Sequence, residues 1–124
     1  MRLFIGDDSE ILRERLIDIL SDIEGVEIIG QAGDVESVLR SIKQLEPDLV
    51  ILDIQIPGGN GIVALENIKK RARPPIVIMF TNYPYLQYRK KCIELGADFF
   101  FYKSTEFEKL IKVVRKAIQA ISSK

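Results

Sequence analysis

Three carboxylates, a hydroxyl and an ammonium group stand directly after short hydrophobic runs of the chain. These groups belong to Asp7, Asp8, Asp53, Thr81 and Lys103. Runs of four or five mainly β-branched, leucine and aromatic residues are typical of buried strands in a parallel sheet. Ligand sites of open α/β sheets lie at the carboxyl ends of the strands. The five side chains are therefore expected to share one pocket, which would be a divalent-metal and phosphoryl site.

The chemistry of the pocket follows from its carboxylates. Three such groups close together raise one another's pKa unless a cation neutralises them. Carboxylate oxygens with room for water are ligands that suit Mg²⁺ or Mn²⁺. An acidic pair before a helix more often caps that helix, so Asp7 and Asp8 alone favour capping. The addition of Asp53 at a neighbouring strand end makes the metal site the better interpretation.

Asp53 is the candidate nucleophile. The chain contains no histidine, which excludes histidine-dependent triads, histidine-ligated zinc and an internal phosphohistidine. A carboxylate can attack phosphorus to form an acyl phosphate. Lys103 and Thr81 could then stabilise the transferring group. A lysine at a strand end is usually only solvated. Lys103 therefore supports a phosphoryl site only because the carboxylates and Thr81 are expected beside it.

The composition fits one globular domain. The chain has 124 residues, of which 47% are hydrophobic and 29% charged. Lys+Arg and Asp+Glu both number 18, so no bulk attraction to nucleic acid or an anionic membrane is expected. No membrane span or signal peptide is visible. Cys92 is the only cysteine, which fits a cytoplasmic location and, without a histidine to activate it, a packed thiol.

Strand and helix patterns alternate along the whole chain. Strands are predicted over residues 3–5, 26–32, 49–52, 76–80 and 99–102, and helices over residues 11–23, 35–45, 62–68, 84–95 and 107–121. Right-handed crossovers between such units give a three-layer α/β sandwich. We therefore predict a flavodoxin-like (βα)5 fold, with a parallel five-stranded sheet of order 2-1-3-4-5.

Several residues predict where the helices begin and end. Gly25 is expected to end the first helix, and Asp34 is expected to cap the second. Pro84 suits the first turn of the fourth helix, and Gly96 suits its C-terminal cap. Thr105 and Glu108 have the spacing of a capping box before the last helix. The glycines of residues 58–61 match no phosphate-binding motif and predict a flexible loop.

Taken together in this order, the motifs carry a resemblance to a known family. The chain resembles the receiver domain of two-component response regulators over essentially its full length, residues 1–124. The resemblance rests on Asp7-Asp8, the run Asp53-Ile54-Gln55-Ile56-Pro57 with Gly61 beyond it, Thr81, Gly96-Ala97-Asp98 and Lys103.

The resemblance implies a role for each of these residues. Asp53 would be the phosphoacceptor, and Lys103 would pair with the phosphoryl group. Mg²⁺ would be bound by Asp8, Asp53 and the backbone carbonyl of Gln55, with Asp7 acting largely through water. Two further residues, Thr81 and Phe100, would be the switch hydroxyl and the switch aromatic.

Three positions depart from the family pattern. Ser104 replaces the proline, often in a cis bond, that usually follows the lysine, which removes a rigid turn. Asn82 stands where a small residue is usual, and we expect it to narrow access to Asp53. Phe100 replaces the more frequent tyrosine. Residues Gln55 and Tyr83 lie where the family varies and where dephosphorylation rates are set.

The resemblance implies a phosphorylation-driven signalling domain rather than an enzyme acting on other molecules. Its expected partner is a sensor histidine kinase or a phosphotransfer protein, and its expected output face is the fourth helix, fifth strand and fifth helix, through which it could form a homodimer. No direct contact with nucleic acid or membrane is expected. A front fragment of a DNA-binding transcriptional regulator and a degenerate receiver acting as a protein-interaction module stay open as alternatives.

Two other classes of protein fit these residues less well than the receiver. An aspartyl-intermediate phosphatase commonly needs a second acid two residues after its nucleophile, and this chain has Gln55 there. A flavin or cobalamin carrier on the same fold conflicts with the Asp7-Asp8 pair and with the missing histidine. Absorbance of the purified protein would test the carrier.

Overall fold

The computed structural model describes residues 1–122 as a strict alternation of strands and helices. The strands are β1 Arg2–Gly6, β2 Glu27–Ala32, β3 Leu49–Leu52, β4 Ile76–Thr81 and β5 Phe99–Tyr102. The helices are α1 Glu10–Ser21, α2 Val35–Leu45, α3 Gly61–Lys69, α4 Leu86–Glu94 and α5 Phe107–Ser122. No helix within these residues is both long enough and apolar enough to cross a membrane.

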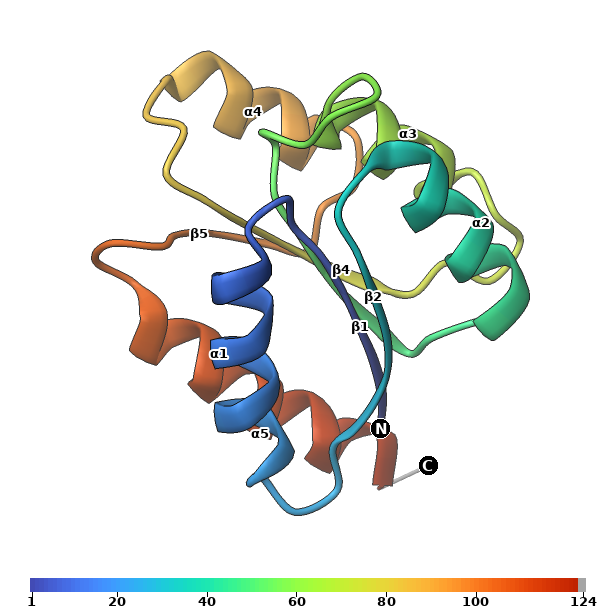
Figure 1. The fold of residues 1–124 in the computed structure, drawn as a ribbon, viewed down its shortest axis with the longest axis vertical. Helices are drawn as coiled ribbons and strands as arrows, with labels where there is room; N and C mark the ends of the chain where they lie inside the picture. Colours follow the sequence, from blue (N-terminus) through green and yellow to red (C-terminus); the bar gives the residue numbers. More distant parts are fainter. Residues whose placement is uncertain (123–124) are drawn as a thin grey trace.

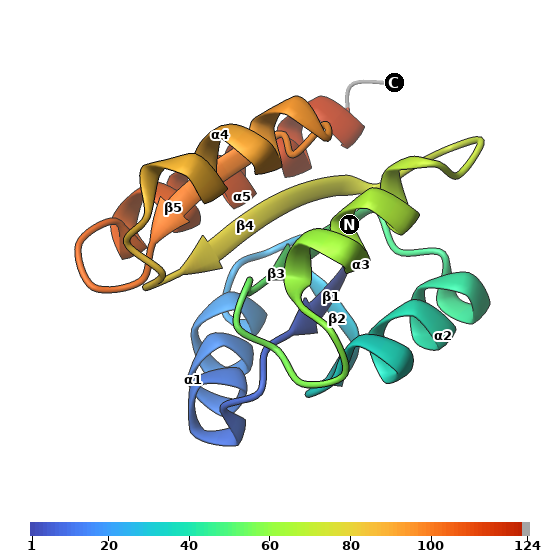
Figure 2. The same ribbon diagram turned by 90° about the horizontal axis from the view of Figure 1, so that it is seen from above.

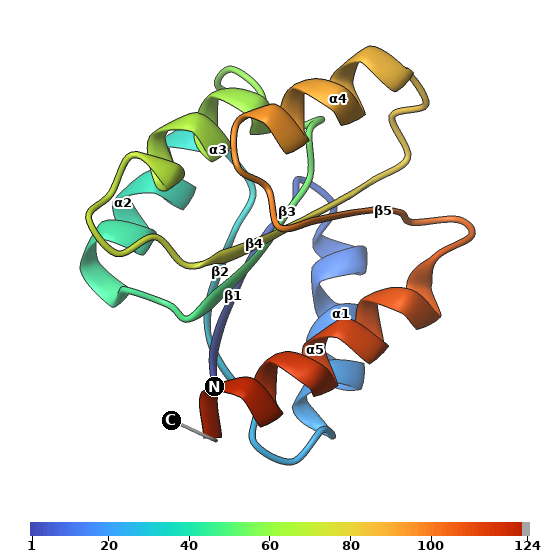
Figure 3. The same cartoon turned by 180° about the vertical axis from the view of Figure 1, so that it is seen from behind.

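The strands form one parallel sheet in the order β2-β1-β3-β4-β5, as predicted. Helices α1 and α5 cover one face of the sheet, and α2, α3 and α4 cover the other (Figure 1). The view from above shows the sheet between these two helical layers, and the view from behind shows the same grouping (Figures 2 and 3). The flavodoxin-like three-layer prediction is therefore confirmed.

The core has two halves because side chains alternate across each strand. In β3 all four residues are buried. Leu49 and Ile51 pack in the half beneath α1 and α5, whereas Val50 and Leu52 pack in the half beneath α2, α3 and α4. The buried sheet centre fixes the strand ends, and therefore the residues that follow them.

Several helix boundaries follow the sequence signals. The Asp34 carboxylate caps α2 by accepting a hydrogen bond from Ser37 N at 2.8 Å. Glu46, just before Pro47, leaves the helix with φ of 48°. Gly96, with φ of 100°, follows the last residues of α4. The Asn60 side chain caps α3, accepting from Ile62 N and Val63 N, which the sequence analysis did not identify.

Three boundary predictions are wrong. Helix α1 ends at Ser21, well before Gly25. Ile23 follows the helix but still packs in the core, so the hydrophobic pattern continues past the last helical residue. Pro84 lies outside α4, since the N-cap Tyr85 is extended and the helix begins at Leu86.

The predicted capping box of the last helix is also absent. Helix α5 starts at Phe107, one residue too late for Thr105 to be its cap. The Glu106 carboxylate instead accepts a hydrogen bond from Tyr102 N at 3.0 Å, while Glu106 N donates to Tyr102 O at 2.9 Å. This reciprocal pair closes the β5–α5 turn.

Candidate phosphoryl and metal site

The acidic residues are held by hydrogen bonds that continue the sheet beyond its strands. Asp7 N donates to Ala32 O, and Asp53 N donates to Gly6 O, each at 3.0 Å. Both Asp7 and Asp53 are 3% exposed, while Asp8 faces solvent. The sheet therefore fixes two buried carboxylates and leaves the third at the open side of the site.

Gly61 brings the start of α3 against the end of β3. Gly61 N donates to Ile54 O at 2.7 Å. A Cβ atom at this position would lie 1.9 Å from the backbone oxygen of Asp53. Only glycine fits there without moving the backbone that carries the candidate nucleophile.

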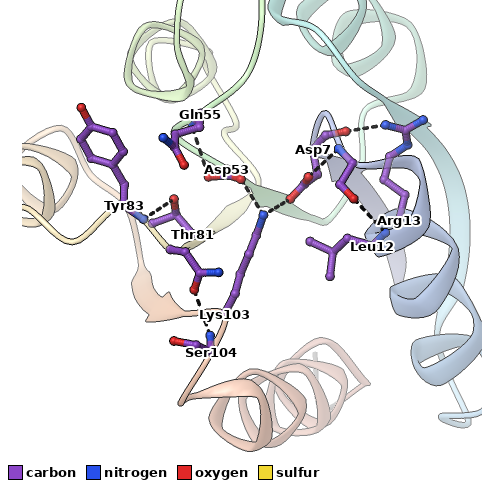
Figure 4. Close-up of polar contacts among 11 residues, drawn as sticks. Asp7, Leu12, Arg13, Asp53, Gln55, Thr81, Tyr83, Lys103 and Ser104 are labelled. Carbon is purple, nitrogen blue, oxygen red and sulfur yellow. Dashed lines mark hydrogen bonds and ion pairs between the residues drawn. The ribbon is translucent and has the colours of Figure 1, made fainter.

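Lys103 lies between the two buried carboxylates (Figure 4). Its Nζ is 2.6 Å from Asp7 Oδ2 and 2.6 Å from Asp53 Oδ2. Its backbone N donates to Thr81 O at 3.0 Å, which extends the pairing of β4 and β5. Charge-assisted contacts this short bind both acids strongly, and the ammonium group is already beside Asp53.

Backbone N–H groups complete the environment of both acids. Ser9 N donates to Asp7 Oδ1 at 2.9 Å, and Gln55 N donates to Asp53 Oδ1 at 3.1 Å. Burial raises the pKa of Asp7 above its ordinary value, and the hydrogen bonds from Lys103 and Ser9 offset that effect only in part. Burial lowers the pKa of Lys103, but hydrogen bonds with Asp53 and Asp7 outweigh it and leave the pKa raised.

The acidic cluster fits a small divalent cation. One oxygen from each of Asp7, Asp8 and Asp53 lies within 4.8 Å of the others. Three carboxylates face a single ammonium group, so negative charge is in excess. Oxygen ligands with an open, solvated side are what Mg²⁺ prefers. The donor set of the site therefore suits Mg²⁺, the ion named by the sequence analysis.

The two predicted switch residues lie on β4 and β5, and their side chains have partners other than the acids. Thr81 is fully buried, and its Oγ1 accepts a hydrogen bond from Tyr83 N at 3.2 Å. Phe100 is 3% exposed and packs on the α4 side of the sheet, with the Arg89 guanidinium carbon 5.5 Å from its ring centroid. Among the described residues, no hydrogen bond joins the Thr81 hydroxyl to the acids or to the Lys103 ammonium group.

The predicted residues therefore divide into three groups. The structure brings together Asp7, Asp8, Asp53 and Lys103. Gln55 joins them through its backbone N–H, with its side chain exposed. Of the other two predicted residues, Thr81 is the last residue of β4 and Phe100 lies within β5, and neither side chain is hydrogen-bonded to the carboxylates.

The sequence analysis missed two supporting residues. Arg13 Nη1 donates to Asp7 O at 2.5 Å, and Arg13 Nε donates to Gln31 Oε1 at 2.8 Å. Ser9 is the N-cap of α1, accepting from Leu12 N at 3.2 Å, so neither Asp7 nor Asp8 has that role. A serine before the first periodic hydrophobic residues is a signal that could have identified this cap.

The expected effect of Asn82 on access to Asp53 stays a prediction, but the Asn82 side chain has a partner that the sequence did not reveal. Its side-chain oxygen accepts a hydrogen bond from Ser104 N at 3.0 Å, so it is tied to the β5–α5 turn. Beside the acids, a cavity of about 360 Å³ is lined by residues that include Asp8, Gln55, Tyr83 and Tyr88.

Comparisons with known proteins agree with the fold and the site. The family model described as response regulator receiver domain matches residues 3–115. The uncharacterized transcriptional regulatory protein YvfU of Bacillus subtilis is 32% identical over 119 residues, covering 96% of this chain and 60% of YvfU. Across the first curated relatives, the chain spans 23% to 60% of their length.

Solved structures give the same result. The response regulator domain of CheB from Thermotoga maritima matches with a TM-score of 0.86 and 27% identity, covering 96% of both chains. The response regulatory domain of mrkE from Klebsiella pneumoniae matches with a TM-score of 0.89 over 100% of both chains; its 23% identity supports the fold alone. Sequence, topology and acidic site thus agree, and the chain belongs to the response regulator receiver domain family.

Proposed function

We propose that the chain is a phosphoacceptor signalling domain in which Asp53 is phosphorylated. The donor would be a phosphohistidine of a sensor histidine kinase or of a phosphotransfer protein, or a small phosphodonor. One observation carries the proposal: Lys103 Nζ lies 2.6 Å from Asp53 Oδ2, in a cluster whose other two carboxylates can hold Mg²⁺. The acceptor, the metal ligands and the neutralising cation are all in reach of one phosphoryl group.

The transfer is a displacement at phosphorus. A carboxylate oxygen of Asp53 forms the new P–O bond while the P–N bond of phosphohistidine breaks, and the imidazole leaves with the electron pair and takes up a proton. Lys103 then holds the phosphoryl oxygens in place of its present contact with Asp53. When bound, Mg²⁺ would supply charge neutralisation for those oxygens. Later attack by water on the acyl phosphate releases inorganic phosphate.

The switch would run from Thr81 to the surface of α4, β5 and α5. In this proposal the Thr81 hydroxyl gives up Tyr83 N and donates to the phosphoryl group. Phe100 then repacks beneath α4. The buried positions of Thr81 and Phe100 support this, because neither can move without changing α4 or its loop.

The proposed output surface is partly apolar. Tyr85, Leu86, Ile93 and Phe99 are exposed on α4, its N-cap and β5, and these positions would contact a partner or a second copy of the chain. Because YvfU is named a transcriptional regulatory protein and is longer, we infer that residues 1–124 could be the receiver part of a DNA-binding regulator. The receiver itself, with zero formal net charge, would not bind nucleic acid.

The test is intact mass after incubation with acetyl phosphate and Mg²⁺. Wild type should gain one phosphoryl group, Asp53→Asn none, and the exposed-helix control Asp18→Asn should gain it like wild type. Chelation of the metal should prevent the gain. If the acyl phosphate is too short-lived to be seen by mass, beryllofluoride, which mimics the phosphoryl group on the Asp53 carboxylate, should still bind. Failure of wild type in both assays would overturn the proposal and favour a degenerate receiver that acts as an interaction module.

A further inference from the structure

Two successive hydrogen bonds tie the loop after β4 to the turn after β5. The first joins Lys103 N to Thr81 O at 3.0 Å and uses only backbone atoms. The second joins Ser104 N to the side-chain Oδ1 of Asn82, also at 3.0 Å. Apart from the bond between Lys103 N and Thr81 O, the bond between Ser104 N and Asn82 is the one hydrogen bond in residues 1–122 that joins these two loops. Figure 4 shows it beside Lys103 and Thr81.

The bond requires both departures from the family pattern. A proline at position 104 has no N–H to donate, and an alanine or glycine at position 82 has no side-chain oxygen to accept it. Ser104 and Asn82 are therefore complementary: one supplies the donor that proline would remove, and the other supplies its acceptor. The Lys103–Ser104 peptide bond is trans, as are the other peptide bonds of the described chain.

We propose that Asn82 is a positioning residue for phosphoryl transfer, acting through Lys103. The inference rests on the proposed function. Asn82 is exposed and touches none of the carboxylates. Its bond holds the backbone immediately after Lys103, whose Nζ must stay beside Asp53, and it starts from the residue immediately after Thr81. The hydrogen bond thus sets the spacing between the cation and the switch hydroxyl, in place of a rigid proline turn.

The rest of the turn does not supply this restraint. Glu106 N and Thr105 N both donate to Tyr102 O, at 2.9 and 3.4 Å, and the Glu106 carboxylate accepts from Tyr102 N. These bonds close the turn upon β5 itself. Without Asn82, the backbone at Ser104 has no tie to the β4–α4 loop. Because the Asn82 bond is exposed to water, its loss should have a moderate effect, roughly threefold to tenfold in affinity.

The experiment is a double-mutant cycle on the full chain, with beryllofluoride affinity in Mg²⁺ as the readout. Asn82→Ala and Ser104→Pro remove the acceptor and the donor, whereas Ser104→Ala keeps the backbone N–H. Asn82→Ala should weaken binding roughly threefold to tenfold, and Ser104→Ala should bind like wild type. In the Ser104→Pro background, Asn82→Ala should have no further effect. Asn67→Ala, an exposed asparagine on α3, is the matched control.

The NMR signal of the Ser104 amide proton distinguishes the loss of this one hydrogen bond from a general destabilisation of the fold. In Asn82→Ala the amide proton of Ser104 should shift and exchange faster with solvent. Asn82→Asp keeps the acceptor oxygen and should restore the Ser104 signal toward its wild-type position.

Three results would overturn the inference. One is an Asn82→Ala variant that binds beryllofluoride like wild type. The second is independent, multiplying effects of the Asn82 and Ser104 substitutions. The third is an Asn82→Ala variant that is phosphorylated faster than its parent both with Ser104 and with Ser104→Pro. In that case Asn82 would act by obstructing access to Asp53 and not through its hydrogen bond. If wild type neither gains a phosphoryl group nor binds beryllofluoride, the proposed function itself fails. If wild type binds beryllofluoride and only the expected effects of the Asn82 substitutions are missing, the inference alone fails.

Discussion

Lys103 neutralises two buried acids at once, and its own side chain is only 15% exposed. Removing it by Lys103→Met leaves Asp7 and Asp53 facing each other without a cation. We expect the free energy of unfolding in metal-free buffer to fall by about 2–3 kcal/mol, less than the ~3–5 kcal/mol of a fully buried pair. Urea unfolding measures this, and Mg²⁺ should restore part of the loss.

The matched control is Lys109→Met. Lys109 pairs with Glu106 at 2.8 Å, but its side chain is largely in solvent. Exposed pairs contribute little, so the change should stay below about 0.5 kcal/mol. Equal losses for the two lysine variants would contradict the view that burial makes the Lys103 contacts strong.

Asp7 should make the metal-free protein less stable at neutral pH. Burial raises its pKa above the ordinary value of 3.8, so the folded state binds the proton more tightly than the unfolded chain does. Its stabilising contribution is then complete below the unfolded pKa and is lost as the pH rises through the folded pKa. Asp7→Asn should therefore be more stable than wild type at pH 7.

Urea unfolding between pH 4 and 8 with a chelator tests the Asp7 prediction. The advantage of Asp7→Asn over wild type should shrink as the pH falls, because wild-type Asp7 then becomes protonated. The exposed Asp18→Asn should follow wild type throughout. A wild type more stable than Asp7→Asn at pH 7 would show that the Lys103 contact outweighs the cost of burial.

At the scale of elements, the junction of β3 and α3 is the tightest part of the site. Gly61→Ala would place a Cβ atom 1.9 Å from the backbone oxygen of Asp53, so one of the two elements must move. We expect a loss of about 3 kcal/mol or more in unfolding free energy, together with a loss of beryllofluoride binding. Gly33→Ala is the control, since its nearest contact is the flexible end of Arg13. A stable, binding Gly61→Ala would be inconsistent with this geometry.

Topology explains why the acidic site could be predicted from sequence. Parallel strands bring their carboxyl ends to one edge, so Asp7, Asp53 and Lys103 had to meet once five buried runs were identified. The same strand geometry places Phe100 and Phe101 on opposite faces of β5, in the two halves of the core. Neither result needed any knowledge of helix ends.

Local competition explains most of what could not be predicted. Thr105 and Glu108 had the spacing of a capping box, but Glu106 bonds the backbone of Tyr102 instead. Which side chain bonds the backbone before α5 depends on the position and direction of the chain where β5 ends. The bond between Asn82 and Ser104 joins residues 22 positions apart, and no local spacing reveals it. Sequence alone showed that positions 82 and 104 depart from the family pattern and could not show that they are hydrogen-bonded to each other.

For the whole molecule, ligand binding at the site should stabilise the fold. The acids and the cation follow β1, β3 and β5, so a bound phosphoryl analogue would contact residues from three of the five strands. With Mg²⁺ and beryllofluoride at one hundred times the dissociation constant, the free energy of unfolding should rise by about 2.7 kcal/mol. Thermal unfolding measures the increase.

The variant Asp53→Asn serves as the control for this linkage. It keeps the fold and the other acids but lacks the oxygen that beryllofluoride binds, so the analogue should leave its unfolding temperature unchanged. A similar increase in wild type and Asp53→Asn would show that the analogue binds elsewhere.

The buried thiol of Cys92 provides a way to measure how often helix α4 opens. Cys92 lies on α4, is completely buried, and its pKa is raised by burial to about 11. A thiol-specific dye can therefore react only during the moments when α4 lifts from the sheet. The rate of dye capture, compared with and without beryllofluoride, would time the opening of the surface proposed to carry the signal, with no label or engineered cysteine needed.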